Sequence, residues 1–360
     1  MNFPKLTDEF IKNRLIMPVG KVPCVIDTDT YNEVDDQFAV SWAMRSPERL
    51  DVKAVYAAPY GHKLDPSIPG AELFSKFASQ MPSYEPSAAQ GMLNSYDELL
   101  RLFDHMGIDP EGIVFKGSTS YIGKTGKPVE SEAARDLVKK AMAQPDDEPL
   151  YVIAIGAITN VVSAMLMEPE IIKKIVVVWL GGQPIHFEHA FEFNLIQDIP
   201  AVQILFNSGV PLVYIPCMTV ASLLTISAEE LQANLVGKSK IGTYLSDIVI
   251  SQLGGPPIAG EMFGKSMSGS YLKGEDDMPQ EVLDQFHCQA VAWTRIIWDI
   301  SAVGYVMNPN WALTTVEPAP VLGDDARWIR TDEHRHPIRV CNYVFRDLIY
   351  GDMFLKLAHD

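Results

Sequence analysis

Cysteine, basic residues and long apolar runs are all scarce in this sequence of 360 residues. Its four cysteines lie far apart and form no Cys-x-x-Cys pair, which argues against a disulfide framework and a zinc ribbon. Lys and Arg number 29 against 46 Asp and Glu, so the formal net charge of −17 disfavours nucleic acid or an anionic membrane as a partner. No segment approaches the roughly 20 apolar residues that span a bilayer, and residues 1–21 lack the apolar core of a signal peptide. We therefore expect a cytoplasmic protein.

Short runs rich in Val and Ile alternate with amphipathic stretches along most of the chain. The runs predict buried strands at 22–26, 52–57, 151–155, 175–180 and 211–215. Apolar strands separated by helices predict an α/β fold, doubly wound, with a mainly parallel sheet flanked by helices. The stretch 237–300 is mostly helical in pattern and predicts a helical addition over the active site, with a rim loop at 254–279. We expect residues 1–360 to form a single domain.

The most informative segment follows the first predicted strand, where Asp27 and Asp29 precede Asp35 and Asp36 at the start of a helix. Ligands of open α/β sheets bind at the carboxyl ends of strands. Carboxylates this dense repel one another unless a cation neutralises them, and hard oxygen ligands suit Ca²⁺ or Mg²⁺. A solvated turn whose acids cap the next helix is the plainer interpretation, but it explains Asp27 and Asp29 poorly.

Asp299 is a further acid that needs an explanation, because it stands in the apolar run 296–300, which we interpret as part of a helix. A charge on such a face needs a partner or a metal ion.

A strand followed by Asp-x-Asp also resembles the haloacid-dehalogenase phosphohydrolases, in which Asp27 would be the nucleophile and Mg²⁺ the cofactor. That pattern requires Thr or Val two residues after the second Asp, where this chain has Tyr31. An acidic pair is present at Asp324 and Asp325, but no convincing phosphate-binding Lys precedes it. This phosphohydrolase function is the alternative hypothesis.

Five segments in collinear order resemble the inosine–uridine-preferring nucleoside hydrolase family more closely. The first is the Asp27–Asp36 segment, which is two residues longer than the family's commoner form. The others are the segments 151–161 (YVIAIGAITNV), 175–182 (IVVVWLGG), 192–198 (EFNLIQD) and 298–309 (WDISAVGYVMNP). The resemblance implies the family's α/β fold and hydrolysis of a nucleoside to free base and ribose.

The resemblance also implies roles for individual residues. The implied ligands of Ca²⁺ are Asp29, Asp36, Asp299 and the main-chain carbonyl of Ile155, with Asp27 supporting them from behind. Asp29 would also serve as general base toward a water molecule activated by the cation. The implied contacts to the nucleoside are Asp35, Glu192, Asn194 and Trp298. A homo-oligomer, dimer or tetramer, is common in the family.

The sequence departs from the family where the leaving base would be bound. Trp298 replaces a His that serves one branch as leaving-group acid, and an indole cannot supply a proton at pH 7. Residues 58–62 (APYGH) replace a segment with an Asn. Stacking on an aromatic ring is a plausible substitute, for which the candidates are Trp298, Trp293, Trp42 and Tyr31; the conceivable acids are His62, His186, His189 and His287. These departures sustain a third hypothesis, a nucleoside- or ribose-binding protein without turnover.

Overall fold

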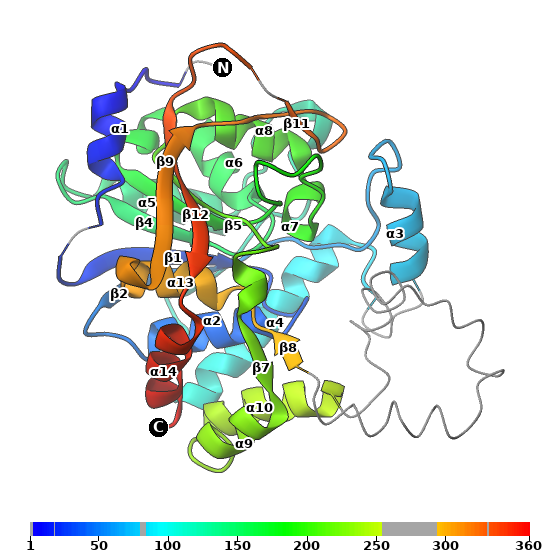
Figure 1. The fold of residues 1–360 in the computed structure, drawn as a ribbon, viewed down its shortest axis with the longest axis vertical. Coiled ribbons are helices and arrows are strands. Elements are labelled where there is room, and N and C mark those ends of the chain that lie inside the picture. Colours follow the sequence, from blue (N-terminus) through cyan, green and yellow to red (C-terminus); the bar gives the residue numbers. More distant parts are fainter. Residues whose placement is uncertain (1–2, 18, 80–83, 254–293, 330) are drawn as a thin grey trace.

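The computed structural model describes residues 3–17, 19–79, 84–253, 294–329 and 331–360. Its centre is an eight-stranded sheet in the order β3-β2-β1-β4-β5-β6-β12-β9 (Figure 1). The strands are β1 (Val22–Thr28), β2 (Leu50–Ala57), β3 (Val114–Lys116), β4 (Leu150–Ala154), β5 (Ile175–Leu180), β6 (Leu212–Ile215), β9 (Ala312–Pro318) and β12 (Pro337–Val344). The pairs are parallel up to β12, and the edge strand β9 pairs antiparallel with β12. The predicted mainly parallel sheet is therefore confirmed.

Helices cover both faces of the sheet. Those contributing to the core on one face are α1 (Asp8–Arg14), α2 (Asp35–Met44), α4 (Ala88–Met106), α9 (Ala228–Asn234), α10 (Lys240–Leu253), α13 (Ile300–Met307) and α14 (Arg346–Leu357). Those contributing on the other face are α3 (Ala71–Ala78), α5 (Glu132–Met142), α6 (Thr159–Met167), α7 (Phe193–Ile196) and α8 (Ile199–Ser208). The α3 helix lies at the periphery of the molecule (Figure 1).

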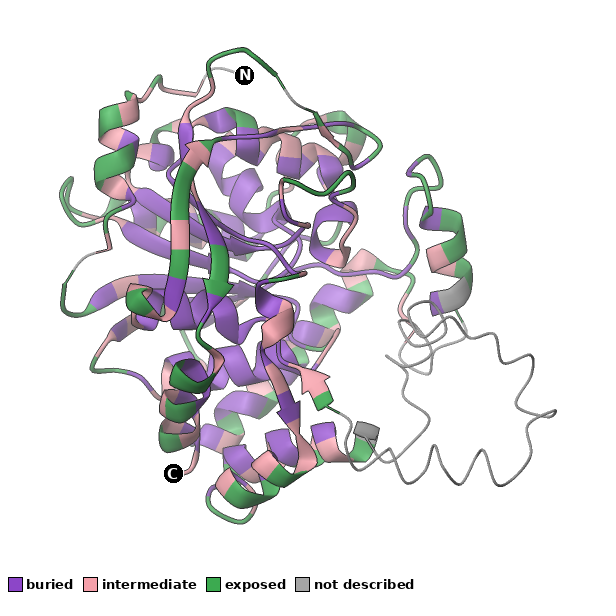
Figure 2. Cartoon of the chain, viewed as in Figure 1, coloured by how far each residue is buried: buried purple, intermediate pink, exposed green. Residues whose placement is uncertain are grey.

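The alternation of side chains along the central strands explains why the chain builds two cores. In β5, Ile175, Val177 and Trp179 face one core, whereas the intervening Val176, Val178 and Leu180 face the other. Successive side chains of a strand point to opposite faces, so an unbroken apolar run fits a strand that is covered twice. Figure 2 shows the central strands buried along almost their whole length. Each fully buried side chain of this kind contributes about 1.5–3 kcal/mol to folding.

Shorter elements complete the described chain. Two small antiparallel sheets pair β7 (Thr225–Ser227) with β8 (Thr294–Ile296) and β10 (Val321–Leu322) with β11 (Trp328–Ile329). The 3₁₀ helices are η1 (Gly123–Thr125), η2 (Pro169–Lys173), η3 (Ala221–Leu223) and η6 (Pro309–Trp311). Within the predicted helical addition at 237–300, the described part includes α10, which packs against α4 and α9. The predicted rim loop at 254–279 lies outside the described residues.

Three cysteines, Cys24, Cys217 and Cys341, are buried free thiols, and Cys288 lies outside the described residues. No helix in the described part of the chain combines the length and apolar character that a membrane span requires.

Two helical glycines provide a test of this packing. A Cβ at Gly91 of α4 would lie 2.0 Å from the carbonyl oxygen of Tyr60, whereas a Cβ at Gly351 of α14 would meet nothing within 4 Å. We expect Gly91→Ala to lower the free energy of unfolding by about 3 kcal/mol or more, because backbone must move. Gly351→Ala should be neutral or add up to about 1 kcal/mol. Urea unfolding measures both values, and equal stabilities of the two variants would contradict the packing described.

Candidate active site

The predicted acidic residues lie where the winding direction of the sheet reverses. From β1 the chain proceeds to β2 and β3 on one side, whereas β4, β5 and β6 follow on the other side. The carboxyl ends of β1 and β4 therefore border a crevice, which is the usual ligand position in an open α/β sheet. Asp27 belongs to β1, and Asp29 follows its last residue directly. Both side chains are buried, with exposures of 0% and 1%.

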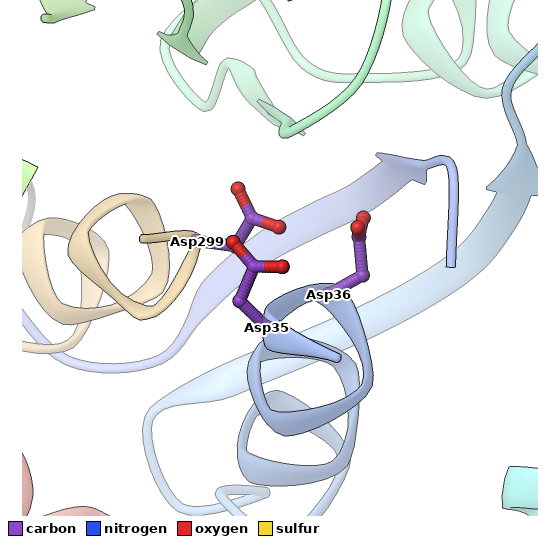
Figure 3. A group of neighbouring side chains, drawn as sticks. All are labelled: Asp35, Asp36 and Asp299. Atoms are coloured by element: carbon purple, nitrogen blue, oxygen red, sulfur yellow. The ribbon is translucent and has the colours of Figure 1, made fainter. Parts of the chain in front are cut away.

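Two helix N-termini bring three further carboxylates to this crevice. Asp35 and Asp36 form the first turn of α2, and Asp299 is the residue before α13 (Figure 3). One carboxylate oxygen from each of these three residues lies within 4.8 Å of the other two. Helix N-termini favour negative charge, which offsets part of the repulsion. The interpretation of 296–300 as helical was wrong for its first residues, since Ile296 ends β8 and α13 starts only at Ile300.

Burial and mutual repulsion raise the pKa values of the converging acids. Burial is the main cause for Asp29, Asp36 and Asp299, and neighbouring aspartates add to it. The pKa of Asp35 rises to about 7, chiefly through burial and then through Glu33, although Arg295 opposes the rise. Arg295 itself forms an ion pair with Glu33 at 3.0 Å. Four carboxyl groups are thus held where their ionised forms need a cation.

Unpartnered oxygens at the site fit a metal ion. Asp29 Oδ2 and Asp35 Oδ1 are buried and have no hydrogen-bond partner among the described residues. Asp36 is partly satisfied, because the Thr28 hydroxyl donates a hydrogen bond to its Oδ1. A set of hard carboxylate oxygens with free lone pairs is the donor chemistry of Ca²⁺ or Mg²⁺ sites. The three carboxylates within 4.8 Å of one another include Asp35. The ligands that the resemblance implies include Asp29 instead of Asp35.

The carbonyl of Ile155 lies at the same edge, immediately after β4. It accepts a hydrogen bond of 3.1 Å from Asn194 Nδ2, which also donates to the carbonyl of Leu180 at 3.2 Å. Asn194 thus ties together the ends of β4 and β5. The next residue, Gly156, is required by contact, since a Cβ there would lie 2.7 Å from Asp29 Oδ1.

Glu192 is held mainly by backbone N–H groups. Its carboxylate accepts hydrogen bonds from Gly182 at 2.6 Å, from Asn194 at 2.9 Å and from Leu195 at 3.2 Å. Burial raises its pKa to about 6, and these hydrogen bonds limit the rise. Gly182 has φ of +69°, a conformation that favours glycine. Gly182, the second of the two glycines after β5, therefore orients Glu192 through its N–H.

Asp27 lies in the interior of the sheet, two residues before Asp29. Its Oδ1 accepts a hydrogen bond of 2.8 Å from Asn160 Nδ2, while its Oδ2 has no partner among the described residues. Burial raises its pKa to about 7, and Asn160 opposes the rise. Asn160 also donates to the Ala57 carbonyl and accepts from the Ser118 N–H. The sequence pattern contained Asn160 in its GAITN segment but assigned it no role.

A cavity of about 280 Å³ opens above these groups, close to the lower size limit of small-ligand sites. The predicted residues that line it are Asp29, Asp35, Asp36, Ile155, Glu192, Asn194, Trp298 and Asp299. The cavity is also lined by residues that the sequence did not predict at a base pocket, among them Phe74, Phe191, Phe193 and Cys217. His62, considered only as a conceivable acid, also lines it.

Two of the predicted stacking residues lie elsewhere. Trp42 is fully buried, stacks on Trp311 and donates its indole hydrogen to Asp352. Tyr31 is 50% exposed and does not line the cavity. Trp293 and His287 lie outside the described residues, and His186 and His189 do not line the cavity.

The raised pKa values predict that the metal-free protein loses stability as the pH rises. Unfolding returns the aspartates to about 3.9, so between about pH 4 and 7 the native state binds more protons than the unfolded state. The free energy of unfolding should therefore fall through this window, and a bound divalent cation should restore it. Thermal unfolding in EDTA and in millimolar CaCl₂, at about pH 5 and about pH 8, tests this. A Tm in EDTA that does not fall with pH, or no effect of Ca²⁺ at pH 8, would contradict the expectation.

The chain is similar to known proteins in sequence and in fold. Residues 24–342 match the family described as inosine-uridine preferring nucleoside hydrolase. A pyrimidine-specific ribonucleoside hydrolase of Shigella sonnei (strain Ss046) is 25% identical over 280 residues, 77% of this chain and 76% of that protein. Its counterpart in Escherichia coli (strain SE11) is 24% identical over 290 residues, 79% of this chain and 78% of that protein.

Solved structures share the fold. A purine-preferring ribonucleoside hydrolase from Gardnerella vaginalis superposes with a TM-score of 0.62 at 19% identity, covering 93% of this chain and 98% of the other. A plant nucleoside hydrolase has a TM-score of 0.61 at 18% identity, covering 95% and 100%. With the family match spanning most of its length, the chain belongs to the inosine-uridine preferring nucleoside hydrolases, enzymes that act on N-glycosyl bonds.

Proposed function

We propose that this protein hydrolyses the N-glycosidic bond of a ribonucleoside to free base and ribose, and that it requires Ca²⁺. The main support is that buried carboxylates with unpartnered oxygens converge on the cavity, where the strand order of the sheet reverses. The family supplies the type of bond, and the cavity supplies room for a small molecule beside the acids.

For the metal we propose the ligands Asp29, Asp36, Asp299 and the carbonyl oxygen of Ile155. Asp36 and Asp299 belong to the three carboxylates that lie within 4.8 Å of one another. Asp29 lies close to both, since Asp36 raises the pKa of Asp29 and Asp29 raises the pKa of Asp299. The Ile155 carbonyl has a second lone pair besides the one that accepts from Asn194. When bound, Ca²⁺ would lower the pKa of a water molecule and hold it near the anomeric carbon.

The remaining chemistry belongs to the side chains. Asp29 would take a proton from the attacking water, as a general base. Asp35 would accept hydrogen bonds from ribose hydroxyls through its unpartnered oxygen. Asn194 and Glu192 would bind the sugar from the β5 side. As the glycosidic bond breaks, the positive charge that develops on the ribose would be stabilised by the surrounding carboxylates.

The alternative hypotheses fit the site less well. A phosphohydrolase would need Asp27 as an accessible nucleophile, but Asp27 is fully buried, is bonded to Asn160 and does not line the cavity. Asp324 and Asp325 line a separate hollow that includes neither Asp27 nor Asp29. A binding protein without turnover would keep the metal site, and an activity assay decides that case.

The first experiment follows release of free base and reducing sugar from a panel of purine and pyrimidine nucleosides, with Ca²⁺ and with EDTA. We expect hydrolysis that EDTA abolishes and Ca²⁺ restores. Binding of nucleosides without any product would favour the binding protein. Cleavage of a phosphate monoester but of no nucleoside would reject the proposal.

Paired variants separate metal binding from sugar binding. Asp29→Asn should lower kcat by about 10³-fold or more and weaken the stabilisation by Ca²⁺, since it removes both a base and a ligand. Asp35→Asn should mainly raise KM and leave the Ca²⁺-dependent rise in Tm in place. The exposed Asp147→Asn is the matched control and should behave as wild type. If Asp35→Asn abolishes the Ca²⁺ effect and Asp29→Asn does not, the two assignments must be exchanged.

The cytoplasmic location and the homo-oligomer, dimer or tetramer, remain proposals that follow from composition and from the resemblance. Fractionation of cells and the mass in solution test them.

A further inference from the structure

We propose that His62 binds the nucleobase as a neutral imidazole and donates a hydrogen bond from Nε2 to it as the base leaves. The proposal rests on the proposed nucleoside hydrolysis and names the group that stabilises the leaving base. His62 lies in the segment after β2, is 5% exposed and lines the same cavity as the acids.

Two hydrogen bonds fix the position and the tautomer of His62. Its backbone N–H donates to the Glu85 carbonyl at 2.7 Å, and the Glu85 N–H donates to His62 Nδ1 at 2.9 Å. A nitrogen that accepts an N–H carries no hydrogen, so the hydrogen of the neutral ring is on Nε2. Among the described residues Nε2 has no hydrogen-bond partner, which leaves a donor for a ligand.

Aromatic rings surround this donor. The ring of His62 lies 5.6 Å from that of Phe193 and 6.0 Å from that of Tyr84, and Phe193 lies 5.9 Å from Phe74. His62, Phe74 and Phe193 all line the cavity. Flat heteroaromatic bases stack on such rings whatever their identity. The cavity thus combines carboxylates from the residue after β1, from α2 and from the start of α13 with aromatic rings from α3, α7 and the segment after β2.

The surroundings of His62 favour a hydrogen-bond donor over a proton source. Burial lowers its pKa, although Glu85 and Glu33 act in the opposite sense. Protonation of Nδ1 would also break its bond with the Glu85 N–H. A neutral Nε2–H matches a ring nitrogen or exocyclic oxygen of the base, whose negative charge grows as the bond breaks, so the hydrogen bond strengthens in the transition state.

The step balances without a further reactant. The carbon–nitrogen bond breaks and its electron pair leaves with the base, while the water oxygen bonds to the anomeric carbon. Asp29 takes one proton of that water, and the base takes up one proton from solvent. His62 keeps its own hydrogen throughout.

Three substitutions separate donation to the base from the contact with Glu85. Asn in place of His62 offers an amide oxygen near the position of Nδ1, so it keeps an acceptor for the Glu85 N–H but has no group at Nε2. His62→Gln places an amide N–H₂ near Nε2. His62→Phe keeps an aromatic ring without a donor. The exposed His186→Asn, outside the cavity, is the matched control.

The experiment measures kcat and KM of each variant on nucleosides whose bases differ in acidity and on 4-nitrophenyl riboside, whose leaving group is stable as an anion. We expect His62→Asn and His62→Phe to lower kcat on nucleosides by about 10- to 100-fold, with the greatest loss for the least acidic base. Nitrophenyl riboside should lose less than about 3-fold, and His62→Gln should recover part of the nucleoside activity. His186→Asn should match wild type.

Equal losses of kcat on all substrates would overturn the proposal and assign His62 to holding the Glu85 segment alone. Unchanged kcat in His62→Asn, with wild type active on nucleosides, would reject the contact while leaving the proposed function intact. Wild type that cleaves neither nucleosides nor nitrophenyl riboside would reject the proposed function and this proposal together.

Discussion

Repulsion among buried carboxylates is the constraint on which this site depends. Each acid of the cluster lies close enough to another to affect its pKa, and burial removes the water that would screen their charges. The cluster consists of Asp29, Asp35, Asp36 and Asp299. Helix N-termini and a few hydrogen bonds reduce the repulsion, but two oxygens remain without partners among the described residues. Such an arrangement is stable in its ionised form only with a cation. The repulsion that lowers the stability of the metal-free protein therefore also favours the binding of a metal ion.

The sheet explains why these acids meet. Reversal of the strand order places the ends of β1 and β4 side by side, and α2 and α13 direct their N-termini to the same place. Close approach then requires small residues, as at Gly156, where any side chain would collide with Asp29. Asn194 joins the ends of β4 and β5, and the Gly182 N–H after β5 holds Glu192, which gives these polar groups a rigid frame.

Much of this could be predicted from sequence because the signals are local. An apolar strand followed by alternating acids predicts both β1 and the ligand-binding edge. The errors and omissions arise where partners are distant in the chain. The apolar run around Ile296 predicts a helix, yet Ile296 lies in β8 and pairs with Thr225 in β7. Nothing near Phe74 indicates a contact with Phe193, since the contact exists only after α3 and α7 have met. For His62 a weak signal existed, its place shortly after the end of β2.

The hydrogen bonds of Asn160 have a consequence for the order of folding. They join it to residues 133, 103 and 42 positions away, namely Asp27, Ala57 and Ser118. Closing such long loops is slow and is rewarded only when the distant segments have already docked. The floor of the crevice can therefore form only after β1, β2 and β4 have paired. A nascent chain released before β4 emerges would hold its acids apart in water, without the binding site and without its electrostatic cost.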